Sequence, residues 1–119
     1  MHDQLIIKRL KSVYESIVTL QLYITPIEKY EDFHGGDGQL IYDAVLMRLQ
    51  VIGENIKAIN KKAPDVIDIN TEEISSIIRF RDLISHHYEK LDTELVFDIC
   101  TIYIPRFKQQ IQELLTSNK

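Results

Sequence analysis

The sequence predicts an all-α protein, an antiparallel bundle of four long helices and one short helix. Apolar residues recur at spacings of three and four through long polar stretches, and few segments alternate strictly between apolar and polar residues. The 119 residues are 45% hydrophobic and include only four glycines and three prolines, which excludes a linker array or a collagen-like repeat. At this length we expect one domain over residues 1–119.

The first long helix is expected over about residues 3–22, where an apolar stripe follows helical spacing. Pro26 and the glycine-rich segment 35–38 interrupt the pattern after it, because both residue types favour turns. A short helix fits between these two interruptions, at about residues 26–33.

The second and third long helices are delimited by a proline and a capping pattern. The second is expected over about residues 38–62 and ends before Pro64, since proline disfavours helical backbone at the residue before it. The third is expected to begin at Asn70, which can cap it, with Glu73 at the capping-box position. It should run to about Tyr88.

The fourth long helix is expected over about residues 92–116, with Asp92 as its cap. Pro105 lies inside this segment and cannot donate a hydrogen bond to the carbonyl of Thr101. A kinked helix and two abutting helices both agree with this pattern.

The charge balance restricts how this protein can bind nucleic acid. With 14 basic and 18 acidic residues the net charge is −4, whereas domains that bind nucleic acid through a broad basic surface usually have a high pI. We therefore expect any contact with nucleic acid to use a local patch.

Cysteine content and hydropathy restrict the compartment. Cys100 is the single cysteine, so an internal disulfide and a multi-cysteine metal site are excluded. No apolar run approaches the roughly 20 residues that span a bilayer, and the first four residues are too polar to start a signal peptide. We expect a soluble cytoplasmic protein that binds no membrane.

Two of the expected helices carry an arginine on their apolar face. On the third helix, Arg81 projects into the isoleucine-rich stripe, whereas His86 projects to the polar side beside Arg79. A straight helix keeps His86 away from Arg81. The two side chains can converge only if the helix loosens near its end or if a second subunit closes the site.

On the second helix, Arg48 and Asn55 both fall in the apolar stripe. A guanidinium on an apolar face is costly unless it is paired or that face meets a polar cleft. The two arginines therefore suggest a shared polar cleft or a subunit interface. The structural alternative is a buried arginine that pairs with Asp43, Glu54 or Asp82.

The segment 80–88 holds three residues at a fixed spacing: Arg81, then four residues, His86, one residue and Tyr88. This spacing resembles the HEPN signature of HepT-like ribonuclease toxins, the partners of MNT-type minimal nucleotidyltransferases in toxin–antitoxin pairs. Histidine suits proton transfer near neutral pH, and the planar arginine fork pairs with two phosphoryl oxygens.

The flanking segments extend the resemblance over about residues 3–116. The segment 48–54, with its Ile-Gly-Glu run, resembles part of the family's preceding long helix, and Pro105 resembles a proline of its C-terminal helix. Two features depart from the family pattern. Arg79 stands where members often have a small residue, and the tryptophans that members often carry are missing.

The resemblance implies a metal-independent endoribonuclease that cuts RNA and uses neither cofactor nor metal. Its active unit would be a homodimer or higher homo-oligomer, with the motif lining a cleft between subunits. Arg81 and His86 would be catalytic. Tyr88 would bind substrate or accept AMP from the nucleotidyltransferase antitoxin, which silences the toxin. The supporting residues would be Arg48, Asp82 and Glu54.

Two other classes of function remain open at this point. Related helical bundles serve as the non-catalytic, substrate-binding subunit of two-chain nucleotidyltransferases, and a structural dimer is also possible. From pattern alone His86 is typical of a surface histidine. The intact set of Arg81, His86 and Tyr88 favours the ribonuclease, because a binding subunit has no need of a histidine for proton transfer.

Overall fold

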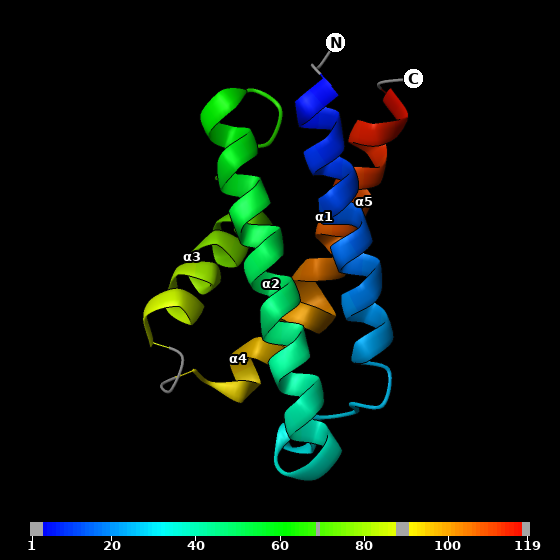
Figure 1. Cartoon of the computed structure of the whole chain (residues 1–119), viewed down its shortest axis with the longest axis vertical. Helices are drawn as coiled ribbons and strands as arrows, with labels where there is room; N and C mark the ends of the chain where they lie inside the picture. Colours follow the sequence, from blue (N-terminus) through cyan, green and yellow to red (C-terminus); the bar gives the residue numbers. More distant parts are fainter. Residues whose placement is uncertain (1–3, 69, 88–90, 118–119) are drawn as a thin grey trace.

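The computed structural model describes residues 4–68, 70–87 and 91–117. These residues form helices and connecting turns without strands, so the predicted all-α bundle is confirmed (Figure 1). The long helices α1 and α2 run antiparallel side by side, and α2 packs on its other flank against α3. The elements in chain order are α1 (Gln4–Tyr23), η1 (Tyr30–Phe33), α2 (Gly36–Lys62), α3 (Glu72–His87), α4 (Thr93–Asp98), η3 (Ile99–Tyr103) and α5 (Ile104–Ser117).

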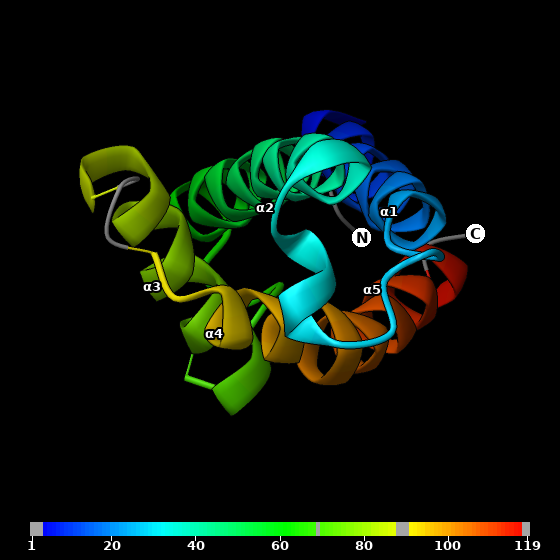
Figure 2. The same ribbon diagram turned by 90° about the horizontal axis from the view of Figure 1, so that it is seen from below.

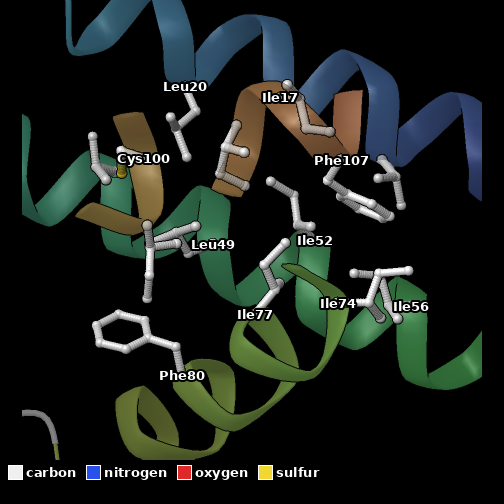
Figure 3. Close-up of a cluster of buried hydrophobic side chains, with 14 of the residues drawn as sticks. Ile17, Leu20, Leu49, Ile52, Ile56, Ile74, Ile77, Phe80, Cys100 and Phe107 are labelled. Carbon is white, nitrogen blue, oxygen red and sulfur yellow. The ribbon is translucent and has the colours of Figure 1, made fainter. Parts of the chain in front are cut away.

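The helices enclose one apolar cluster built from the stripes seen in the sequence (Figure 3). Three fully buried residues meet between the helices: Ile17 of α1, Ile52 of α2 and Phe107 of α5. Ile77 and Phe80 extend the cluster along the inner face of α3. Burying a side chain of this size stabilises the fold by about 1.5–3 kcal/mol. This cluster fixes α2 and α3 against each other, and Arg81 of the motif lies where these two helices meet.

The short helix is confined to the end of its expected range. Residues 30–33 form one 3₁₀ turn, which lies across one end of the bundle between α2 and α4 (Figure 2). Phe33 is buried and packs against Tyr42, with ring centroids 5.1 Å apart. The chain then turns into α2 through Gly35 at φ 74° and Gly36 at φ 52°, a backbone region that favours glycine.

The start of α3 differs from the prediction. The helix begins at Glu72, because a local turn forms first: the backbone amide of Asn70 donates to Asp68 Oδ1 at 2.9 Å. Asn70 is therefore not the cap. Glu73 pairs with Arg106 of α5 at 3.6 Å, so its carboxylate contacts a neighbouring helix.

The fourth helix begins as predicted and is interrupted near its proline. The side chain of Asp92 accepts a hydrogen bond from the backbone amide of Glu94 at 2.9 Å, which confirms the cap. Residues 99–103 then form a π-helical turn, after which α5 continues with Pro105 in its first turn. The missing N–H of proline explains why the α-helical ladder is interrupted at this point. None of the described helices combines the length and apolar character needed to cross a membrane.

Candidate active site

Arg81 lies on the face of α3 that packs against α2, and its side chain is 23% exposed. Its Nη2 is 3.3 Å from Glu54 Oε1 on α2, and its Nη1 donates to Asp82 Oδ1 at 3.1 Å. Both carboxylates are among the partners that the sequence suggested for a buried arginine. Arg81 Nε is also buried, and it has no hydrogen-bond partner among the described residues.

Gly53 gives the Arg81 side chain its space on α2. A Cβ atom at position 53 would clash with the Cβ of Arg81 and lie 2.7 Å from its Cγ. The Ile-Gly-Glu run therefore has a structural meaning in this fold: Ile52 fills the core, Gly53 accommodates the arginine stem, and Glu54 pairs with the guanidinium. In the sequence, the position of Gly53 within the Ile-Gly-Glu run was the one indication that this residue matters for the site.

Asp82 joins a second cation to the site. Lys57 Nζ lies 3.3 Å from Asp82 Oδ1, the same oxygen that accepts from Arg81. Desolvation acts to raise the pKa of Asp82, but the hydrogen bonds from Arg81 and Lys57 outweigh it and hold this pKa below its ordinary value. Lys57 was not among the site residues expected from the sequence. Its position three residues after Glu54, on the same face of α2, was the available signal.

His86 lies on a different face of α3 from Arg81. The helix remains regular through His87, so five residues separate the two side chains by about 140° around the axis. His86 is exposed, in line with Arg79. The structure thus excludes a loosened helix end before His87 as the means of convergence. Closure by a second subunit stays a prediction.

Arg48 lies away from the site of its own chain. It is half-buried on α2 and falls within about 20° of Asn55, which is seven residues further along the helix. Asn55 accepts a hydrogen bond from Arg9 of α1 at 3.1 Å, so this flank of α2 faces α1. Arg48 and Arg81 do not share a cleft within one chain. Tyr88 lies outside the described residues.

The comparison with protein-family models adds an independent finding. The model described as Ribonuclease HepT-like matches residues 13–114, which span α1 to α5 and most of the chain. The chain belongs to the HepT-like ribonuclease family. Searches among curated proteins and among solved structures returned no match. Membership implies ribonuclease activity and hence an RNA substrate for this HepT-like protein.

The HepT-like helix α3 presents a guanidinium that suits phosphoryl recognition. An arginine fork pairs with two oxygens of one phosphate, and charge-assisted bonds of this kind are about twice as strong as neutral ones. The two carboxylates that hold Arg81 are about half exposed, at 49% for Glu54 and 45% for Asp82. They orient the guanidinium while leaving it accessible from solvent.

Proposed function

We propose that this HepT-like ribonuclease is a metal-independent endoribonuclease toxin whose active site forms between two copies of the chain. The family match over residues 13–114 carries the ribonuclease assignment. The geometry of α3 supports the two-subunit site, because Arg81 and His86 lie on different faces of one regular helix. A second α3 could supply whichever group the first does not present.

The cleavage chemistry requires groups that α3 carries. The 2′-hydroxyl must lose a proton, the pentavalent phosphorus must be stabilised, and the leaving 5′-oxygen must gain a proton. Histidine performs both proton transfers near neutral pH, and Arg81 stabilises the extra negative charge. In each site of a dimer, His86 of one chain works with Arg81 of the other: it takes the proton from the 2′-hydroxyl and, once protonated, gives it to the leaving 5′-oxygen. No metal ion is needed for these steps.

The surface beside Arg81 supports the proposed dimer. A depression of about 510 Å³ lies where the end of α3 meets α2, between Met47 and Ser85. On the exposed side of α2, Met47 is 54% exposed and Leu40 is 69% exposed. These two side chains lie on the flank that also carries Glu54. An isologous contact through this flank would bury both and bring two α3 helices together.

The proposal extends to control by a partner. By resemblance to the MNT–HEPN pairs, a nucleotidyltransferase antitoxin adds AMP to Tyr88. Each AMP would bring a phosphodiester of charge about −1 and a bulky nucleoside to a position seven residues after Arg81 in the sequence. The modification would compete with RNA phosphate for Arg81 and block the cleft.

The catalytic role is tested by His86→Ala, with His34→Ala as the matched control. His34 is an exposed histidine in the turn before α2, distant in sequence from the motif. Losing a general acid–base should lower RNA cleavage by about 10²–10⁴-fold, while His34→Ala cleaves as the wild type does. EDTA should leave the wild-type rate unchanged. A folded His86→Ala protein with full activity would exclude the catalytic role.

The regulatory role is tested by intact mass after incubation with an MNT-type nucleotidyltransferase and ATP. We expect increments of AMP that map to Tyr88, together with loss of RNA cleavage. Tyr88→Phe should keep most cleavage and escape silencing, because its hydroxyl is the acceptor of AMP but not the main proton carrier. AMP on another tyrosine, or none, contradicts this control. A wild-type chain that cleaves no RNA would instead favour the substrate-binding subunit.

A further inference from the structure

A groove of about 310 Å³ runs along α3 on the flank away from Gly53 and Glu54. One wall comes from α3 and the other from α4 and the π-helical turn η3. π-Helical turns often occur at functional sites, because the extra residue displaces side chains from the regular helical register. The residues that carry the argument are Ser76, Arg79, Phe80, Leu95, Ile99 and Tyr103.

Arg79 is the available cation of this groove. It is exposed and makes no hydrogen bond or ion pair with a described residue, in contrast to Arg81. Two acidic side chains of α3 have other partners: Tyr103 donates to Oε1 of Glu72, which lines the groove, at 2.9 Å, and Arg106 lies 3.6 Å from Glu73. The guanidinium of Arg79 is therefore free to bind an anion from solution.

The groove shares the helix face of His86. His86 follows Arg79 by seven residues, so the two lie within about 20° around α3 and about 10.5 Å apart along its axis. An RNA strand whose scissile bond lies at His86 would therefore pass Arg79 as it continues along the helix. Within one chain, Arg79 is closer to the face of His86 than Arg81 is.

The shape and lining of the groove suit one nucleotide. The floor of the groove is apolar where Phe80 and Ile99 are buried, and Leu95 is 40% exposed beside them. Proteins that bind single-stranded nucleic acid combine a cation that follows the backbone with surfaces on which bases stack. A concave space near the lower size limit of small-ligand pockets favours a nucleobase over the broad surface of a protein partner.

We propose that this groove is a nucleotide subsite for single-stranded RNA, in which Arg79 binds a phosphate adjacent to the scissile one and the neighbouring base enters between α3 and η3. This inference rests on the proposed ribonuclease function. It assigns to Arg79 the recognition of substrate beyond the reacting phosphate, and it makes the groove a determinant of which RNA sequence is cut.

The experiment measures binding of a 2′-O-methyl RNA oligonucleotide, which lacks the attacking hydroxyl, by fluorescence anisotropy over a range of salt concentrations. Arg79→Gln should weaken binding about tenfold, because a charge-assisted contact is lost. The slope of log K against log salt should fall by about 0.7, the value for one phosphate of a single strand. Arg79→Lys should keep that slope. Lys11→Gln removes an exposed charge on α1 and should change neither quantity.

A second variant tests the base slot independently of charge. Ser76→Phe fills the groove from α3 and should weaken binding without altering the salt slope, because no phosphate contact is removed. Circular dichroism checks that each variant keeps its helices. In cleavage of unmodified RNA, both variants should raise KM more than they lower kcat.

The outcomes separate this inference from the proposed function. If the wild type cleaves RNA but Arg79→Gln keeps its affinity and salt slope, the subsite is wrong and the ribonuclease stands. If Ser76→Phe binds as tightly as the wild type, the base does not enter the groove. If Arg79→Gln loses affinity for the antitoxin alone, the groove binds protein. If the wild type neither binds nor cleaves RNA, the proposed function itself fails.

Discussion

At the scale of single residues, Arg81 combines a fixed position with an accessible charge. Its stem lies against Gly53, and its guanidinium pairs with Glu54 and Asp82 at 3.3 and 3.1 Å. Exposed ion pairs contribute only about 0–1 kcal/mol, so a phosphate can displace these carboxylates at modest cost. The pairs therefore orient the arginine without making it unavailable to substrate.

The lowered pKa of Asp82 predicts a pH dependence of stability. Its ionised form is favoured in the folded state, so its contribution is fully present above the ordinary value of about 4 and is lost as pH falls through the lowered pKa. The free energy of unfolding should therefore decrease more steeply below about pH 4 in the wild type than in Asp82→Asn. Urea titrations at several acidic pH values measure this. Parallel curves for the two proteins would contradict it.

At the scale of elements, the close crossing of α2 and α3 depends on Gly53, which has no side chain. The Cβ of Arg81 occupies the space that a larger residue at position 53 would need. Helix periodicity identifies the two apolar faces but not the distance at which the helices approach. The close approach lets the guanidinium reach Glu54 on the neighbouring helix.

Gly53→Ala is expected to destabilise the fold. In an exposed helix this change stabilises by about 0.8–1.0 kcal/mol, because alanine has the higher helix propensity. Here the added methyl group meets the Arg81 stem, and overpacking of this kind costs about 1–3 kcal/mol. Urea denaturation should therefore show a lower midpoint for the variant. A raised midpoint would mean that the helices separate without penalty.

The element boundaries show what local sequence determines. The apolar stripes predicted 3–22 and 38–62, and the structure has helices at Gln4–Tyr23 and Gly36–Lys62. The start of α3 was wrong because Asp68 forms a competing turn, which depends on local side-chain hydrogen bonds. In the sequence, Pro105 was the one feature that indicated an interruption of the fourth helix, and it did not specify a π-helical turn.

For the candidate site as well, the sequence predicted the positions of residues around one helix but not the contacts between helices. Helical projection alone placed Arg81 on the apolar face and His86 off it, as the structure has them. Projection could not select Glu54 and Asp82 from the three candidate carboxylates, nor show that the flank of α2 with Asn55 faces α1, because both depend on which helix packs on which flank. Such contacts join residues distant in sequence, and one helix pattern does not encode them.

At the scale of the whole molecule, an acidic protein presents its cations locally. The net charge is −4, yet Lys57, Arg79 and Arg81 all lie on or beside α3. Lys57 and Arg81 share Asp82 on one flank, and Arg79 lies on the other. An RNA strand that contacts both flanks of α3 has to cross this helix. In the proposed dimer, the second subunit would form the opposite wall of the cleft through which the strand passes.

A two-subunit site predicts that two inactive variants complement each other. Arg81→Ala and His86→Ala homodimers should each be inactive. In an equal mixture after refolding together, half of the dimers are mixed, and each mixed dimer keeps one of two sites with both groups intact. Mixing should therefore restore about a quarter of the wild-type cleavage rate.

The control for this experiment is Arg81→Ala refolded by itself under the same conditions, which should stay inactive. Native mass spectrometry establishes that mixed dimers form, and light scattering at micromolar concentration measures the mass of the wild type. If mixed dimers form and cleave no RNA, Arg81 and His86 must act from the same chain. A wild-type monomer at that concentration would remove the dimer itself, and the separation of the two side chains around α3 would then require another explanation.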